Sequence, residues 1–425
     1  MTTPDQPERD SAAPPQADNP QSAIRDPQSS AGGPADVYHQ RISVPFEYPV
    51  CFTHGLMAEG NDLLAETLDR LGEGRRHRAI AYVDSGLAEA HPRLIERIKE
   101  YFHARPRRME LAAPPQVVPG GESAKNGWQV VRDVMWTAGN LHLDRQSFVV
   151  AFGGGAMLDM VGFAASLVHR GLRLVRVPTT TLAQNDAGVG VKNGMDEHGM
   201  KNFVGTFCPP FAVLNDFEFL RTLAQRDWVG GVAEAFKVAV IKDAAFFEFL
   251  CDRAGDLRAR DQQAMEQCVR RCALLHLEHI RTSGDPFEYG SARPLDFGHW
   301  VGHKLETLSE YCLGHGQCVA IGIAVDSFYA MRLGRIGREV LERIVSGLSA
   351  AGLPVWSGHL TQRGPNGTLT ILQGLDEFRE HLGGSLNVTL PDGLGRKCEV
   401  HQINPQFIQE AVEWLGGRSE GALAE

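Results

Sequence analysis

Three stretches of the chain are apolar without the alternation that a half-exposed strand shows. They are Ala79 to Asp84 (AIAYVD), Ser147 to Gly155 (SFVVAFGGG) and Leu172 to Thr181 (LRLVRVPTTT). Strands of a parallel sheet are buried on both faces and therefore carry continuous apolar runs. The pattern predicts three buried parallel strands.

The segments between these runs have the spacing of helices. Residues 88–102 and 126–140 place apolar side chains three and four positions apart, as an amphipathic helix does. Because strands and helices alternate from residue 37 to 222, we expect an α/β domain here, with a Rossmann-like parallel sheet covered by helices on both faces.

Beyond Thr222 the pattern becomes helical. Segments such as 232–250 and 262–280 keep a helical spacing, and β-rich runs become rare. Residues 223–425 are therefore predicted to form a second, mainly α-helical domain.

The first 36 residues differ from both domains. Residues 1–36 are rich in Pro, Ser, Asp, Gln and Ala and contain almost no large apolar side chains. Such a segment cannot bury enough surface to offset its ordering entropy. We expect a disordered tail without chemistry.

Charge and cysteine content narrow the class of protein. A formal net charge of −10 argues against non-specific nucleic-acid binding, which needs a basic face. No apolar run reaches the roughly 18 residues of a membrane helix, so no membrane partner is expected. The 8 cysteines include no CxxC pair and no dense framework, which indicates reduced thiols in a cytoplasmic protein.

Polar loops follow predicted strands or extended runs. FGGGAMLD opens a helix after a strand, and a glycine-rich helix N-terminus suits the phosphates of a dinucleotide. It lacks the GxGxxG spacing, so a tight strand-to-helix turn without a nucleotide is the alternative. Glu122 and Lys125 in PGGESAKN, and Thr179 and Thr180 in VPTTTLAQND, suit a ribose, a phosphate or a helix cap.

A second group of polar residues lies on glycine-rich loops between residues 169 and 207. Arg170, Lys192, Lys201 and Asn202 stand there among glycines. Cationic donors of this kind bind a phosphate-bearing substrate. Solvated surface cations are the alternative.

Two further patterns have both a structural and a chemical interpretation. Glu234 and Lys237 stand three apart in the apolar segment GGVAEAFKVAV. They either form a buried salt bridge, or Glu234 binds a metal and Lys237 donates a hydrogen bond to the substrate. His299 and His303 stand four apart, so a helix places them on one face, where they either pack in the core or share a cation. His315 follows among glycines.

Taken together, the motifs identify a family. GGESAK, GGGAMLD, PTTTLAQ, GVKNG with a following KN, FLRTL, GVAEAFK, and DFGHWVGHKLE with a following HG stand in the order and spacing of the 3-dehydroquinate synthases and related sugar-phosphate cyclases. The resemblance runs from about Asp84 to His315. It implies a zinc site, or a site for another divalent metal such as cobalt, made by Glu234, His299 and His315. His303 then lines the substrate pocket without binding metal.

The resemblance also implies an NAD site and a substrate site. The residues that match the NAD site are Asp84, Glu122, Lys125, Gly154, Gly155, Ala156, Asp159, Thr179, Thr180, Lys192, Lys201, Phe219 and Thr222. Lys192, Asn202 and Arg170 match residues that hold the substrate phosphate. Because that arginine serves a neighbouring subunit in the family, a homodimer is expected. Lys237 and Asp186 match residues that contact substrate hydroxyls or support the site.

The reaction implied by the resemblance converts a seven-carbon sugar phosphate to a cyclic ketone. A hydride passes to NAD and later returns, phosphate is eliminated between these steps, and an aldol step closes the ring. Metal-dependent NAD polyol dehydrogenases are an alternative of another reaction class, and the combination of Lys192, Lys201 and Asn202 with AEAFK argues against them. A non-catalytic scaffold is a weaker alternative.

The anion-binding residues depart from those of true 3-dehydroquinate synthases. Asp296 stands where those enzymes usually have Asn. They usually have an arginine four residues before that Asn and a lysine one helix upstream. Here Arg293 is three residues before Asp296, and no lysine occurs between Lys242 and Lys304. An ionised Asp296 about 5 Å from a substrate anion would cost about 3 kcal/mol at an effective dielectric near 20. We therefore expect a sugar 7-phosphate without a carboxylate, such as sedoheptulose 7-phosphate. A genuine 3-dehydroquinate synthase is the alternative.

Overall fold

The computed structural model describes residues 39–198, 200–289 and 295–421. The tail expected at residues 1–36 lies outside the described residues. We concentrate on the compact unit that begins at Phe46. Of the helices in the described ranges, none is long and apolar enough to cross a membrane.

One parallel sheet forms the first half of this unit. Its 7 strands follow the order β1-β9-β6-β5-β2-β3, and β4 pairs with β2. The strands are β1 (Val50–Thr53), β2 (His77–Asp84), β3 (Met109–Leu111), β4 (Gln116–Val118), β5 (Phe148–Gly153), β6 (Arg173–Pro178) and β9 (Ala212–Asp216). The three strands predicted from apolar runs are β2, β5 and β6, so the predicted α/β class is confirmed.

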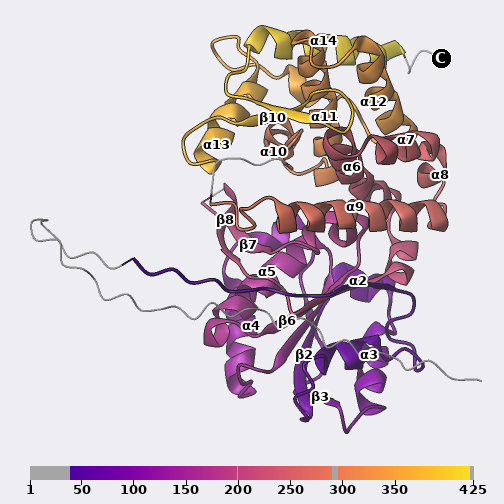
Figure 1. The fold of residues 1–425 in the computed structure, drawn as a ribbon, viewed down its shortest axis with the longest axis vertical. Coiled ribbons are helices and arrows are strands. Elements are labelled where there is room, and N and C mark those ends of the chain that lie inside the picture. The colour runs from indigo at the N-terminus through magenta and orange to yellow at the C-terminus, as the bar shows by residue number, and fades with distance from the viewer. Residues whose placement is uncertain (1–38, 199, 290–294, 422–425) are drawn as a thin grey trace, which may run out of the picture. The chain divides into compact units, whose positions relative to one another are not determined.

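Helices cover both faces of the sheet, because β2 turns alternate side chains to opposite layers. Ala81 and Val83 belong to the cluster that includes α1 and α3, whereas Ile80 and Tyr82 belong to the cluster that includes α4 and α5. Figure 1 shows α3 and α4 on opposite sides of the sheet. The bounds are α1 (Leu63–Leu68), α2 (Ser85–Ala90), α3 (Leu94–His103), α4 (Gln129–Asn140) and α5 (Gly155–Leu167).

Two local expectations were wrong. The helix predicted over residues 88–102 is split between α2 and α3, and Pro92 lies in the break, where its ring and missing N–H disfavour a continuous helix. The second concerns residues expected in glycine-rich loops. They form an antiparallel hairpin of β7 (Lys192–Glu197) and β8 (Met200–Phe207), in which Gly194 pairs with Gly205.

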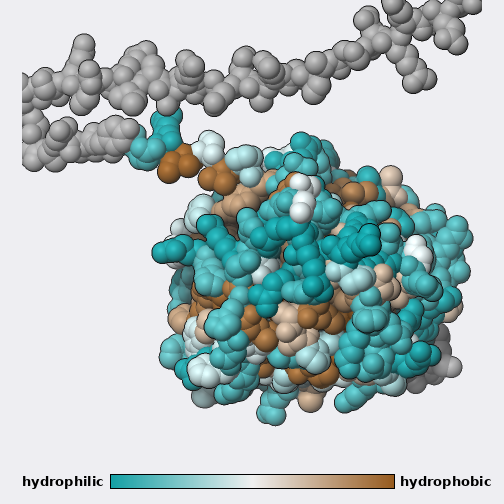
Figure 2. Space-filling view, turned by 90° about the horizontal axis from the view of Figure 1, so that it is seen from below, coloured by the Kyte–Doolittle hydropathy of each residue, from teal (hydrophilic) through white to brown (hydrophobic). Residues whose placement is uncertain are grey.

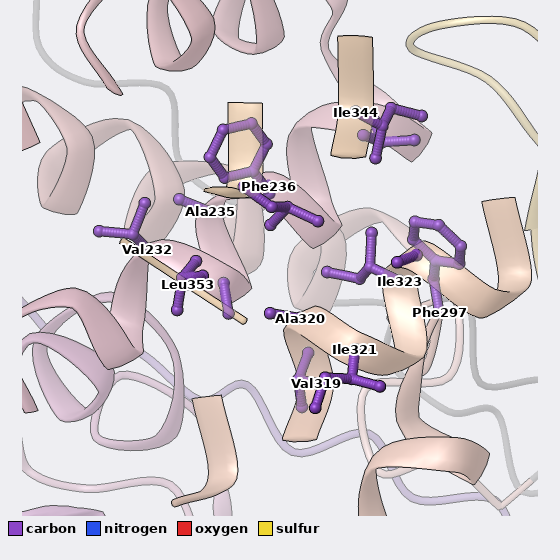
Figure 3. Packing of buried hydrophobic residues seen from close by; sticks show 14 of the residues in the cluster. Val232, Ala235, Phe236, Phe297, Val319, Ala320, Ile321, Ile323, Ile344 and Leu353 are labelled. Carbon is purple, nitrogen blue, oxygen red and sulfur yellow. The ribbon is translucent and has the colours of Figure 1, made fainter. Parts of the chain in front are cut away.

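The second half is mainly helical. Its elements are α6 (Gln225–Lys242), α7 (Ala244–Asp252), α8 (Ala254–Arg258), α9 (Gln262–Thr282), α10 (His299–Leu308), α11 (His315–Arg332), α12 (Arg338–Ala350), α13 (Gln373–His381), β10 (Val388–Pro391), β11 (Lys397–Val400) and α14 (Pro405–Gly421). Buried apolar side chains of α6, α11 and α12 meet in its core (Figure 3). The domain division at Thr222 stays a prediction.

Polar residues cover most of the end of the molecule that carries the sheet. Seen from that end, the surface is mainly hydrophilic, with hydrophobic residues in small groups between polar ones (Figure 2). All 8 cysteines lie among the described residues, and each is a free thiol.

Candidate functional site

Helices α6 and α11 cross at very close range. A methyl group on Gly316 would lie 2.1 Å from the carbonyl oxygen of Gly230. Only glycine permits this approach, because any other residue would place its Cβ inside that contact. Glu234 follows Gly230 by about one helical turn and His315 precedes Gly316, so the crossing brings these two side chains together.

The three residues expected to bind a metal lie together. Oε1 of Glu234 is 3.2 Å from Nε2 of His315 and 3.6 Å from Nε2 of His299. One donor atom from each residue lies within 4.8 Å of the others. A carboxylate and two imidazoles form a donor set suited to a catalytic divalent metal, with positions left for substrate.

The ring orientation of His299 suits a metal ligand. Nδ1 of His299 is 3.2 Å from the carbonyl oxygen of Phe297. When Nδ1–H donates to that oxygen, Nε2 keeps its lone pair toward Glu234. Burial, followed by the positive charge of Lys237, lowers the pKa of His299 to about 4, so the ring is neutral at pH 7.

A buried carboxylate holds the backbone on both sides of His299. Gly298 has a left-handed φ of 80° just before α10. Its N–H donates to Asp326 of α11 at 2.9 Å, and the indole N–H of Trp300 donates to the other oxygen at 2.8 Å. Asp326 therefore fixes the start of α10, and with it the position of His299.

His303 and Glu306 form a second group around His315. The ring of His303 lies 5.3 Å from that of His299 and 6.1 Å from that of His315. Burial lowers the pKa of His303 to about 3, so the ring is neutral. Oε1 of Glu306 is 3.3 Å from Nδ1 of His315. Burial opposes a charge on His315, but Glu306 and Glu234 outweigh it and raise the pKa of the metal-free ring to about 10. A metal that binds Nε2 would displace the proton there.

Lys237 occupies a buried position between two carboxylates. Its ammonium contacts Glu234 and lies 3.5 Å from Asp186, whose carboxylate also lies 2.7 Å from Nδ1 of His276. Burial disfavours the charge of Lys237, but Asp186 and Glu234 outweigh it and raise the pKa. The ammonium is therefore a permanent hydrogen-bond donor beside the metal group.

A cleft of about 640 Å³ adjoins the metal group. The carboxyl ends of β2, β5 and β6 reach it, because these strands are parallel neighbours. The predicted NAD residues that line it are Asp84, Glu122, Gly154, Gly155, Ala156, Thr179, Thr180, Phe219 and Thr222. His315 and Glu306 line the same cleft, so it reaches from the glycine-rich turn to the metal group.

Two lysines predicted in the NAD site are held by carboxylates at the cleft. Nζ of Lys125 is 3.1 Å from Asp159 and 3.9 Å from Glu122, and it also contacts Asn202. Nζ of Lys201 lies 3.0 Å from Glu122 and 2.9 Å from Glu306. The cations thus remain charged while buried, because each has anionic partners.

The remaining predicted residues are placed differently. Lys192 has a 58% exposed side chain and pairs with Glu288 at 2.6 Å. Arg170 is exposed, has a φ of 63° in the short turn after α5, and does not line the cleft. Asp296 is half-buried. Arg293 lies outside the described residues.

Three site residues were not found from the sequence. They are Glu306, His276 and Asp326. Glu306 stands three positions after His303 in HKLE, a spacing that puts both on one helix face. His276 and Asp326 stand in long helical segments, where no local pattern separates them from surface residues.

Two family models match adjoining parts of the chain. One, described as 3-dehydroquinate synthase N-terminal, matches residues 115–230, and the other, 3-dehydroquinate synthase C-terminal, matches residues 231–370. A 3-dehydroquinate synthase of Sulfurovum sp. (strain NBC37-1) is 34% identical over 304 residues, which cover 70% of this chain and 81% of that protein.

Similarity extends to enzymes with another name. A 2-epi-valiolone synthase of Actinosynnema mirum is 33% identical over 347 residues, covering 80% of this chain and 86% of that protein. The solved 2-epi-5-epi-valiolone synthase of Streptomyces hygroscopicus subsp. jinggangensis 5008, with NAD+ and Zn2+ bound, matches with a TM-score of 0.78 at 27% identity. The match covers 90% of this chain and 100% of that one.

Proposed function

The chain belongs to the 3-dehydroquinate synthase family, and from that membership we propose that it is an NAD- and zinc-dependent sugar-phosphate cyclase. In this reaction a seven-carbon sugar phosphate becomes a cyclic ketone, and phosphate is eliminated. The observation that carries the proposal is the metal group Glu234, His299 and His315 at the end of the cleft.

The residues present suit both cofactors. Glu234 and the Nε2 atoms of His299 and His315 would hold the metal, zinc or another divalent ion such as cobalt. The cleft would hold NAD, with the N-terminus of α5 toward the pyrophosphate. Bound there, zinc supplies a Lewis acid and NAD a hydride acceptor.

The chain's own residues bind and orient the substrate. Lys237 stays protonated between its two carboxylates, so it can donate to a sugar oxygen. His303 is neutral and lies half-buried beside the metal group, so it can accept a hydrogen bond from a hydroxyl there. Lys192 and Asn202 would hold the phosphate. Holding the phosphate beside the reacting carbon lets the departing phosphate accept the proton from the adjacent C–H, so elimination needs no dedicated protein base.

We assign Arg170 to a neighbouring subunit's site. In this chain its guanidinium is exposed and outside the cleft lining, so a homodimer is the arrangement that gives it a substrate to bind. We also assign nucleotide binding to residues 37–222 and metal binding to residues 223–425. The 8 free thiols favour a cytoplasmic setting.

The substrate we propose is sedoheptulose 7-phosphate. Sequence identity does not distinguish the candidate substrates, since a 3-dehydroquinate synthase and a 2-epi-valiolone synthase are 34% and 33% identical to this chain. We infer the substrate instead from Asp296. Asp186 and Glu234, and after them Asp296, raise the pKa of Lys237 against the effect of burial, so Asp296 acts on the lysine beside the metal group. An anion there disfavours a carboxylated substrate.

Released phosphate tests the substrate. The full-length enzyme with zinc and NAD is incubated separately with sedoheptulose 7-phosphate and with the carboxylated sugar phosphate that precedes 3-dehydroquinate. We expect phosphate from the first. Turnover of the carboxylated sugar alone would instead make the chain an ordinary 3-dehydroquinate synthase.

Absorbance near 340 nm tests the reaction class. Because the hydride returns in each cycle, phosphate should be released with a catalytic amount of NAD and without a continuous rise in absorbance. Continuous NADH formation would place the chain with the polyol dehydrogenases.

A further inference from the structure

A row of charged side chains connects the nucleotide cleft to the metal group. Oε1 of Glu122 is 3.0 Å from Nζ of Lys201, and the same Nζ is 2.9 Å from Oε1 of Glu306. That oxygen of Glu306 is 3.3 Å from Nδ1 of His315. Glu122, at one end of this row, lines the part of the cleft that contains the glycine-rich turn. His315, at the other end, is a proposed metal ligand.

The two central members of this row, Lys201 and Glu306, depend on their neighbours because their side chains are largely buried. The side chain of Lys201 is 13% exposed and that of Glu306 is 3% exposed. A buried charge is costly unless a partner of opposite sign stays beside it. A change at Lys201 therefore alters the surroundings of Glu306, and a change at Glu306 alters those of His315.

We propose that Glu306 is a positioning residue that orients His315 for the metal and couples metal binding to NAD binding through Lys201. The inference rests on the proposed function, since it needs both cofactors to bind. When Glu306 accepts Nδ1–H of His315, Nε2 faces Glu234 as a ligand. The ammonium of Lys201 pairs with both Glu122 and Glu306. NAD bound at Glu122 therefore changes how strongly Lys201 pairs with Glu306. Such coupling must be reciprocal.

The same residues allow a competing assignment. His303, Glu306 and His315 also satisfy the spacing of a metal group, and Oε2 of Glu306 has no hydrogen-bond partner among the described residues. However, the ammonium of Lys201 lies 2.9 Å from Oε1 of Glu306, the same oxygen that faces His315. In Glu234, by contrast, Lys237 contacts Oε2 and leaves Oε1 facing both proposed histidine ligands. Glu306 is therefore assigned to orienting His315 rather than to binding metal.

The variant Glu306→Gln tests the role, because it keeps the side-chain shape and removes the charge. Zinc-loaded full-length protein is titrated with a chromophoric chelator, with and without saturating NAD, and the two zinc dissociation constants are compared. We expect Glu306→Gln to weaken zinc binding by about 10-fold or more, as loss of an outer partner of a metal-bound histidine does. The ratio of the two constants should differ from one in the wild type and approach one in the variant.

Two further variants control the result. Glu377→Gln removes a glutamate that also pairs with a lysine but lies outside the row: Glu377 is exposed and lies 2.5 Å from Nζ of Lys304. Its zinc constants and their ratio should match the wild type. Lys201→Met removes the link between Glu122 and Glu306 and keeps the side chain of Glu306. It should also bring the ratio to one. This variant tests the coupling if Glu306→Gln does not fold.

Other outcomes separate this inference from the proposed function. A wild type that binds neither zinc nor NAD contradicts the proposed function itself. Two zinc ions per wild-type chain, a wild-type ratio of one, or Glu306→Gln constants within twofold of wild type would overturn the role of Glu306 alone.

Discussion

Oε1 of Glu234 lies 3.2 Å from Nε2 of His315, although the two residues are 81 positions apart in the chain. This contact between side chains depends on how closely the backbones of α6 and α11 approach each other. The carbonyl oxygen of Gly230 occupies the space that a Cβ at position 316 would need. The metal group therefore requires glycine at a position that never touches the metal.

Gly316→Ala should disrupt this geometry. Its methyl group would lie 2.1 Å from the oxygen of Gly230, so α6 and α11 must move apart. We expect a loss of about 1–3 kcal/mol in the free energy of unfolding, as for other overpacked sites, together with weaker zinc binding. Denaturant unfolding and metal analysis of the purified protein measure the two effects.

Gly139→Ala is the matched control. Gly139 lies in α4, and a Cβ there would meet no atom within 4 Å. Since alanine favours a helix by roughly 0.5–1 kcal/mol over glycine, this variant should be as stable as the wild type or more so, with full zinc content. Zinc loss in Gly139→Ala as well would mean that the metal site responds to any helix substitution.

The roles of two histidines are separable by experiment. His315→Ala removes a donor from the group with Glu234 and should abolish metal binding. His303→Ala leaves that group complete, so it should retain zinc and lose turnover. Metal content and phosphate release are measured on both proteins. Equal metal loss would identify His303 as a ligand.

The sequence predicted those parts of the fold that have a continuous local signal. β2, β5 and β6 are long apolar runs, whereas β3 and β4 have three residues each and carry no such run. The hairpin of β7 and β8 was missed because glycines indicate loops, yet here they let two backbones pack closely. Short strands are defined by their neighbours in space, which a single segment cannot show.

The site was predictable only in part for the same reason. Spacing alone paired His299 with His303, and only the order of several motifs placed His315 with Glu234 instead. Glu306 and Asp326 are charged residues within helices, a pattern typical of exposed positions, but tertiary packing buries both. Their partners come from other segments of the chain, so no local pattern reveals them.

Asp326→Asn should destabilise the start of α10. Asp326 accepts from Gly298 and Trp300 with separate oxygens, and an asparagine offers only one acceptor. One buried N–H then loses its partner, at a cost of about 1–3 kcal/mol in the free energy of unfolding. Denaturant unfolding at several pH values measures it, with Asp376→Asn on the exposed side of α13 as control.

The pH dependence of that difference has a definite sign. Burial raises the pKa of Asp326 from 3.8 to about 7. A raised carboxyl pKa contributes stability that is complete below the unfolded value and is lost as the pH rises through the folded value. The deficit of Asp326→Asn relative to wild type should therefore be larger near pH 5 than near pH 8. A deficit that grows with pH would show that Asp326 is stabilised as an anion.

Asp296→Asn should relax the choice of substrate. Asp296 contributes to raising the pKa of Lys237, the lysine that contacts the proposed metal ligand Glu234. Removing a repulsion of about 3 kcal/mol, the value for two like charges about 5 Å apart at a dielectric near 20, would raise kcat/KM for the carboxylated sugar phosphate by up to about 100-fold. The value for sedoheptulose 7-phosphate should fall, because the amide is a weaker acceptor for its hydroxyls. Phosphate release with each sugar gives both constants, and Asp252→Asn, at the exposed end of α7, serves as the control. If Asp296→Asn changes both substrates by the same factor, Asp296 supports the fold of the site and does not select the substrate.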